Sequence, residues 1–132
     1  MKYMLDTNIC IYIIRQKPIQ VIKRFQQTDI GDIGISSITL AELEFGVEKS
    51  QKKDQNALAL AKFLAPIEIH HFDEAAARFY GLIRHNLQSR GQLIGPYDLL
   101  IAAHAIACQV TLITNNLKEF SRIQQLKCKN WI

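Results

Sequence analysis

The sequence contains few cysteines and no long apolar run. Its three cysteines, Cys10, Cys108 and Cys128, are odd in number and far apart in the chain. That spacing argues against a disulfide framework or a zinc site, and it favours a reducing, cytoplasmic setting. No apolar run approaches the ~20 residues of a membrane-spanning helix, and the apolar stretch before Asp6 is too brief for a signal peptide. We therefore expect a cytoplasmic protein with no membrane partner.

The composition is that of an ordinary globular chain with a mild positive charge. Of 132 residues, 48% are hydrophobic and 21% are charged, which predicts one domain spanning residues 1–132. Basic residues number 16 and acidic residues 12; if three acids gather in a pocket, 12 less three leaves 9 acids elsewhere. A basic body around an acidic pocket suits a polyanionic substrate. The excess alone is weak support, because many soluble domains are mildly basic.

Hydrophobic patterning predicts strands that alternate with helices. Strands are expected at residues 3–5, 33–37, 67–72 and 110–114, with an edge strand within 126–132. Helices are expected at residues 9–16, around 21–25, and at 39–51, 56–64, 74–90, 97–108 and 117–121. The helix at 97–108 is apolar on nearly every side and should be central and buried. This order predicts an α/β fold with a parallel central sheet, helices on both faces and right-handed crossovers.

Three acidic residues recur where predicted strands give way to helices. Asp6 follows the first strand, Glu42 lies in the helix after the second, and Asp98 is in the first turn of the buried helix. The carboxyl ends of parallel strands share one edge of a sheet, where ligands bind in open α/β folds. An unpaired carboxylate in an apolar helix is costly, and a shared cation would remove that cost. The three acids therefore indicate a Mg²⁺ or Mn²⁺ site with oxygen ligands.

Each acid also has a purely structural explanation. Asp6 can cap the helix that follows it, and Thr39 with Glu42 matches a capping box. Asp98 would be favoured near a helix N-terminus by the macrodipole.

Asn116 has two alternative roles. It follows the last central strand on the same edge as Asp6, so its carbonyl oxygen can face a metal-bound water. Alternatively it caps the helical turn at 117–121, with Glu119 completing a capping box. An amide adds no negative charge, so the site should bind one metal well and a second only with the substrate.

Several blocks in order resemble PIN-domain ribonucleases of the VapC toxin type, from bacterial toxin–antitoxin pairs. The matching blocks are residues 4–8, 35–46, 94–105, 114–120 and 130–132. The resemblance covers the full length and implies a PIN-like three-layer sandwich. It also implies that Asp6, Glu42 and Asp98 are the metal-binding catalytic acids, with Thr7 and Asn8 supporting the first. Many family members carry Asp where this chain has Asn116.

The resemblance implies a Mg²⁺-dependent endoribonuclease toxin whose target is RNA, with tRNA as the best guess. Metal-assisted hydrolysis of a phosphodiester suits a set of carboxylates, because it requires no His or Lys base. The implied partners are a cognate antitoxin that blocks the site, a second copy in a homodimer, and DNA only through the antitoxin. Apolar Ile19, Val21 and Leu60, on helices after the first two strands, are the expected contact positions.

Two other functions remain alternatives. The chain can be a catalytically inactive PIN-like module that binds RNA or protein, although the three acids argue against it. A phosphatase or receiver domain also places Asp at strand ends, but Asp6 lacks a second nearby carboxylate and the late strand ends without a lysine. Ser36 and Ser37 lack the elbow motif of a serine hydrolase, so we expect at most a hydrogen bond from Ser37 near the metal. The cysteines are expected to be core residues.

Overall fold

The computed structural model describes residues 1–132 and contains one five-stranded sheet in the order β3-β2-β1-β4-β5. All four pairs of neighbouring strands are parallel. The strands are β1 (Tyr3–Leu5), β2 (Ile33–Ser36), β3 (Glu68–His70), β4 (Thr111–Ile113) and β5 (Cys128–Lys129). The predicted parallel α/β fold is therefore confirmed.

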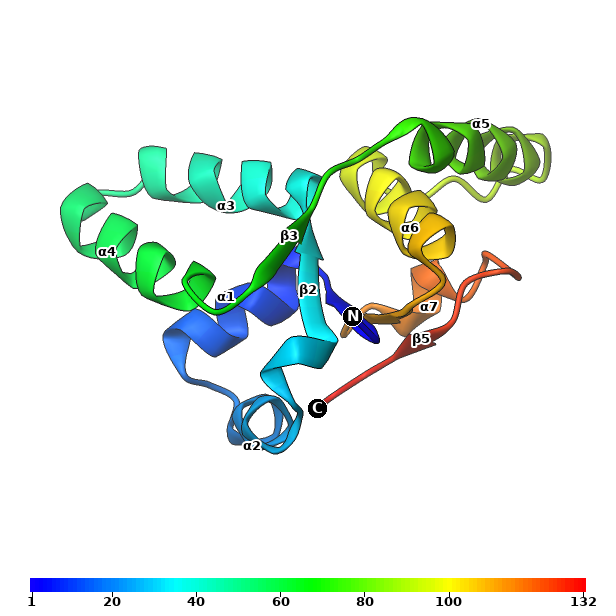
Figure 1. Ribbon diagram of the computed structural model, residues 1–132. Helices are drawn as coiled ribbons and strands as arrows, with labels where there is room; N and C mark the ends of the chain where they lie inside the picture. The colour runs from blue at the N-terminus through cyan, green and yellow to red at the C-terminus, as the bar shows by residue number, and fades with distance from the viewer.

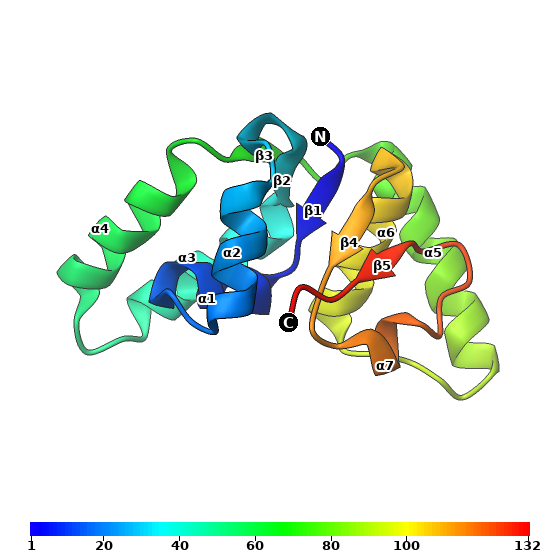
Figure 2. The same cartoon turned by 90° about the horizontal axis from the view of Figure 1, so that it is seen from below.

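Helices connect the strands and cover both faces of the sheet. They are α1 (Thr7–Arg15), α2 (Ile19–Gln27), α3 (Ser37–Glu48), α4 (Lys53–Leu64), α5 (Glu74–Ser89), α6 (Pro96–Cys108) and α7 (Leu117–Phe120), with a 3₁₀ turn at Ile30–Asp32. Figures 1 and 2 show α1 to α4 on one side of the central strands and α5 to α7 on the other. No helix has both the length and the apolar character needed to cross a membrane.

Alternation along the central strands creates a hydrophobic core on each face of the sheet. Met4 packs with α5 and α6, whereas its neighbour Leu5 packs with α1 to α4. Leu112 and Ile113 of β4 divide between the same two cores. Successive side chains of a strand point to opposite faces, and both faces here are covered, which explains why these strands are apolar throughout. The result is a three-layer sandwich.

Helices α1 and α3 begin earlier than their apolar periodicity predicts. Asp6, just after β1, caps α1, and Ser36, the last residue of β2, caps α3. The Ile9 N–H donates to Asp6 Oδ1 (2.9 Å), so α1 begins at Thr7. The Ile38 N–H donates to Ser36 Oγ (3.0 Å), so α3 begins at Ser37. Thr39 therefore lies inside α3, and the predicted capping box from Thr39 to Glu42 is wrong.

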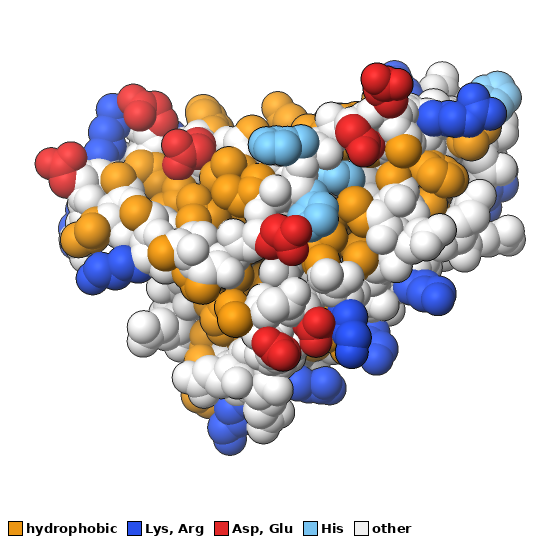
Figure 3. Space-filling view, viewed as in Figure 1, with side chains coloured by type: hydrophobic (Ala, Val, Ile, Leu, Met, Phe, Trp, Pro, Cys, Tyr) orange, Lys and Arg blue, Asp and Glu red, His pale blue; other side chains and the backbone are white.

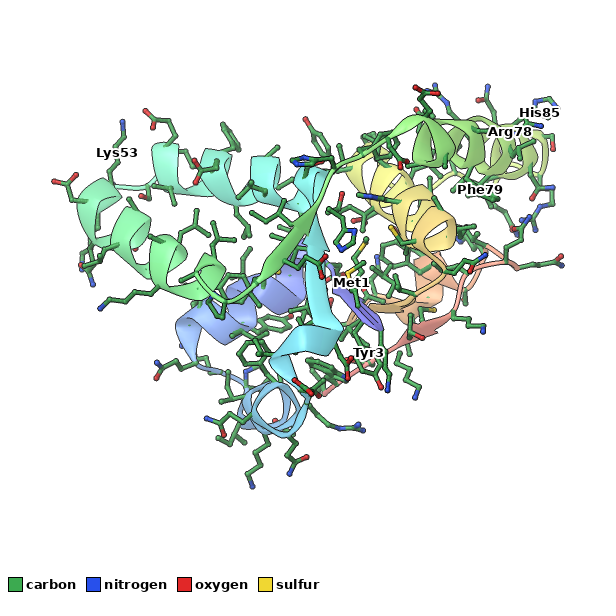
Figure 4. All side chains as sticks on the ribbon, viewed as in Figure 1. Met1, Tyr3, Lys53, Arg78, Phe79 and His85 are labelled. Atoms are coloured by element: carbon green, nitrogen blue, oxygen red, sulfur yellow. The ribbon has the colours of Figure 1, made fainter.

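Several other boundaries differ from the predictions by one to three residues. Among them, helix α4 begins at Lys53 and not at residue 56, and the edge strand is reduced to Cys128–Lys129. Figure 4 shows Lys53 at the N-terminal end of α4, at the other end of the molecule from the α5 side chains Arg78, Phe79 and His85. Neither difference moves a residue of the carboxyl edge.

Helix α6 is central, as predicted, and its middle is buried, at Leu99 and from Ile101 to Ala105. Pro96 occupies its first turn, where the missing N–H has no helical partner to lose. Its buried His104 lies with Nδ1 2.7 Å from Ser36 Oγ and with its ring edge-on to Phe72. Burial lowers the pKa of His104. This histidine therefore ties α6 to the end of β2.

Several smaller expectations also have outcomes. Cys10 is fully buried, and burial raises the pKa of its thiol; all three cysteines are free. Ser37 Oγ accepts from the Phe72 N–H (3.0 Å), so its hydroxyl holds the segment after β3 and not the acids. Histidine side chains gather beside β3 (Figure 3). Of the three expected contact positions, Ile19 is exposed and Val21 is a fully buried core residue that cannot serve as a contact. Leu60 is 3% exposed and lines the groove between α1, α3 and α4.

Candidate active site

Asp6 lies at the carboxyl end of β1, in the middle of the sheet. Its backbone N–H donates to Ile113 O of the neighbouring strand (3.0 Å), which holds it beside the end of β4. Only 3% of the residue is exposed. Burial raises the pKa of the Asp6 carboxyl to about 6, against hydrogen bonds from Thr114 and the backbone, and the nearby Glu42 adds to the rise. Asp6 is thus a desolvated carboxylate with another acid for a neighbour.

Asp98 reaches the same region from the first turn of α6. Burial, with smaller contributions from the charges of Asp6, Glu42 and Glu119, raises the pKa of Asp98 to about 6. Every charged group that shifts the pKa of Asp6 or Asp98 is a carboxylate, and no lysine or arginine offsets them. Repulsion of this kind is what an added cation would relieve.

Glu42 lies on the second turn of α3, and α1 holds it in place. The Thr7 hydroxyl donates to Glu42 Oε1 (2.6 Å) and lies 3.5 Å from the hydroxyl of the buried Thr39. The carboxylate does not bend back to the N-terminus of its own helix. Thr7 therefore contacts the second acid, whereas the sequence suggested that it supports Asp6.

Asn116 ends the loop after β4, and its side chain makes no cap bond to α7. Its amide Nδ2 donates to Glu119 Oε2 (3.1 Å), and its N–H donates to Thr114 Oγ1 (3.0 Å). The predicted capping box is therefore wrong. Glu119, which sequence analysis treated only as a cap partner, lies close enough to Asp98 to raise its pKa. The signal available in the sequence was the single carboxylate, Glu119, on the turn that follows β4.

The donor set fits a hard divalent cation. All four acids are partly or fully buried and are oxygen donors, and no basic group offsets their mutual repulsion. No three His, Cys, Asp or Glu side chains are yet arranged so closely that they could share one metal ion. The acids therefore lie close enough to repel one another, but not so close that three of them could coordinate one metal ion.

A groove of about 680 Å³ begins at this cluster and runs between α1, α3 and α4. Both α1 and α3 start at the carboxyl edge, so the groove opens beside Asn8 and Glu42 and extends toward Arg15 and Lys49 near the helix ends. Apolar side chains form most of its walls, including the exposed Phe45. Hydrophobic side chains also gather between α3 and α4 on the face seen in Figure 3. The groove is therefore apolar, with an acidic end and a basic end.

Known proteins resemble this chain over its whole length. Residues 3–126 match the PIN domain. Ribonuclease VapC2 of Rickettsia felis is 48% identical over 132 residues, covering 99% of this chain and 98% of the relative. The tRNA(fMet)-specific endonuclease VapC of Shigella flexneri is 42% identical over 131 residues, covering 99% and 98%.

Solved structures agree with these relatives. VapBC2 from Rickettsia felis, bound to a DNA fragment from their promoter, superposes with a TM-score of 0.93 at 46% identity, covering 100% of both chains. DNA-bound VapBC from Salmonella typhimurium gives a TM-score of 0.94 at 40% identity, covering 100% of this chain and 99% of the other. These relatives and structures rule out the alternative that the chain is a receiver domain or a phosphatase. The chain belongs to the PIN-domain family, among the ribonucleases of the VapC type.

Proposed function

We propose that this chain is a metal-dependent endoribonuclease toxin that hydrolyses RNA phosphodiesters at Asp6, Asp98 and Glu42, and that a cognate antitoxin inhibits it. The observation that carries the proposal is the cluster of carboxylates, without basic neighbours, at the carboxyl edge of a PIN-domain sheet. Most of the chain matches this family, and the named relatives are ribonucleases.

Each acid has a distinct task in this proposal. Asp6, held by the cap bond from Ile9 N–H, and Asp98, on the rigid α6, would hold Mg²⁺ or Mn²⁺. A bound divalent cation would offset phosphate charge and make water a better nucleophile. Thr7 occupies Glu42 Oε1, which leaves Oε2 to accept a hydrogen bond from the attacking water. Glu119 and Asn116 would complete the rim of the site through their shared hydrogen bond.

We propose a structured RNA, with tRNA as the first candidate, as the substrate. The Shigella flexneri and Salmonella typhimurium relatives are named as tRNA(fMet)-specific endonucleases. Proteins read unstacked bases in the loops of folded RNA more readily than bases within a helix. A net charge of +4, despite the acidic cluster, favours attraction of a polyanion to the surrounding surface.

The antitoxin is proposed to lie in the groove between α1, α3 and α4. The matching solved structures include VapBC toxin–antitoxin complexes. A segment with an apolar face, a basic residue at the Glu42 end and an acidic residue toward Arg15 and Lys49 would complement the groove. Such a segment would cover the acids and so block RNA.

We also propose that the chain forms a homodimer and contacts DNA only through the antitoxin, as the family resemblance implies. The three free cysteines suit the reducing cytoplasm. One sheet that serves both core clusters supports a single domain over residues 1–132.

Purified protein incubated with mixed RNA containing tRNA tests the proposal. Cleavage is expected with Mg²⁺ or Mn²⁺, absent in EDTA, and absent for Asp98→Asn at equal helix content by circular dichroism. Mapping the new 5′ ends would identify the target. A phosphomonoester, run in parallel, should not be hydrolysed. Folded wild type that cleaves no RNA with either metal would favour the inactive RNA- or protein-binding module and refute the proposal.

A further inference from the structure

The ring of Tyr97 lies beside the acids and has no structural partner. Tyr97 follows Pro96 in the first turn of α6 and immediately precedes Asp98. It is 55% exposed, and it lines the mouth of the groove together with Thr7 and Glu42. An aromatic side chain exposed to this extent forgoes the stabilisation that burial would give it.

Two other surface rings are each covered by a cation four residues further along the chain. The Lys49 ammonium lies 5.3 Å from the centre of the Phe45 ring, and the Arg84 guanidinium lies 5.8 Å from that of Tyr80. No aromatic ring or cation pairs with Tyr97, and its hydroxyl makes no hydrogen bond within the chain. The exposed ring of Tyr97 is therefore free to receive a planar group.

The backbone that carries this ring is firmly held. The Leu99 N–H donates to Gly95 O (2.9 Å), and α6 packs against α5 and the sheet with Leu99 and its middle residues buried. In the loop that leads to it, Arg122 Nη1 donates to Leu93 O (3.2 Å) and Arg90 Nη2 donates to Arg122 O (2.9 Å). A ring on so rigid a base loses little conformational freedom when a ligand stacks on it.

We propose that Tyr97 forms a nucleobase subsite, in which its ring stacks on an unpaired base next to the scissile phosphate of RNA. The inference rests on the proposed ribonuclease function. Tyr97 lines the same groove as Glu42, whose charge acts on Asp98, so a phosphate held at these acids has its flanking nucleotides within reach of the ring. Stacking of exposed bases on tyrosine is a common way to bind unpaired RNA.

Charge near the ring favours RNA over a protein segment at this position. Arg90 and Arg122 hold the loop that leads into Tyr97. Arg90 is exposed and Arg122 is half-buried, and neither forms an ion pair with a carboxylate. Their guanidinium groups can attract the phosphates on that side of the bound base. The mixed apolar and acidic groove lies on the other side.

Removal of the ring should weaken RNA binding without slowing the chemistry. Stacking on an aromatic side chain corresponds to about a 5- to 150-fold change in affinity, so Tyr97→Ala should raise KM, and the Kd measured in an Asp98→Asn background, by that factor. Because stacking acts equally on bound substrate and transition state, kcat should change by less than about threefold. Tyr97→Phe and Tyr97→Trp should retain wild-type affinity. Leu82→Ala, at a side chain of matched exposure (54%) on α5, should change nothing.

A double-mutant cycle tests the contact itself. RNA hairpins containing the mapped cleavage site carry an abasic nucleotide on either side of the scissile phosphate. If the ring stacks on one of these bases, Tyr97→Ala and that abasic site should each weaken binding, and together should do no more than either alone. Additive losses with both abasic hairpins, or a fall in kcat alone, would overturn the subsite and make Tyr97 a positioning residue for Asp98.

Two further outcomes would separate the hypotheses. If Tyr97→Ala weakens antitoxin binding but not RNA binding, the ring is a protein contact and the subsite is refuted. Wild-type cleavage of the hairpin is measured first, and its absence would overturn the proposed function itself. Wild-type cleavage followed by an unaffected Tyr97→Ala variant would overturn only the nucleobase subsite.

Discussion

Replacement of Asp6 by Asn should stabilise the protein in the absence of metal. Burial, with a contribution from Glu42, raises the pKa of Asp6 from 3.8 to about 6, so the folded state disfavours the ionised carboxyl. At a value of 1.36 kcal/mol per pKa unit, a shift of about two units corresponds to about 3 kcal/mol at neutral pH. Asn caps helices as well as Asp does and can keep the hydrogen bond from the Ile9 N–H.

The sign of the pH dependence follows from the direction of the shift. The pKa of Asp6 is higher in the folded state than in the unfolded state. The contribution of Asp6 to wild-type stability is therefore fully present below pH 3.8 and is lost as the pH rises through about 6. The advantage of Asp6→Asn over wild type should therefore be small at pH 4 and approach about 3 kcal/mol above pH 7.

Urea unfolding in EDTA at several pH values between 4 and 7.5 measures this difference. Comparing variant with wild type at each pH cancels other titrating groups, His104 included. Asp54→Asn, at an exposed acid in the first turn of α4, should shift stability by less than about 0.5 kcal/mol at any pH. Mg²⁺ should stabilise wild type and leave Asp6→Asn almost unaffected. A less stable Asp6→Asn at pH 7, or an advantage that shrinks with rising pH, would refute the electrostatic account.

Three further predictions concern the other residues near the sheet edge. Asn116→Asp adds a carboxylate and should tighten Mg²⁺ binding in a calorimetric titration; unchanged affinity would place Asn116 outside the metal site. Glu119→Gln should lower the pKa of Asp98 below its metal-free value of about 6, measured by NMR titration of the side-chain carboxyl, and an unmoved pKa would show that Glu119 does not act on Asp98. Ser36→Ala removes both the partner of His104 and the cap of α3 and should lower the free energy of unfolding by about 1–3 kcal/mol; a loss below about 0.5 kcal/mol would mean that water replaces the hydroxyl.

The sequence by itself determined the layer architecture and the location of two acids. Short apolar runs alternating with helical periodicity leave few arrangements other than a parallel sheet between helices. In that arrangement Asp6, directly after β1, must lie on the carboxyl edge. Asp98 could be placed nearby because a carboxylate is unusual at the start of so apolar a helix as α6. These inferences depend only on local pattern and on the rules of strand connection.

Only the tertiary structure determined which residue caps α3, which apolar side chains are buried, and which further acid joins the site. The sequence offered Thr39 as the cap of α3, but Ser36, at the end of β2 beside His104, caps the helix in the structure. From the sequence alone, the apolar side chains of Val21 and Leu60 are compatible with an exposed patch or with a core. The packing of α2 and α4 against the sheet places both in the core. Glu119 became part of the acidic cluster only because the fold brings α7 beside α6. Distances between residues far apart in sequence depend on how whole elements pack, and no local pattern contains them.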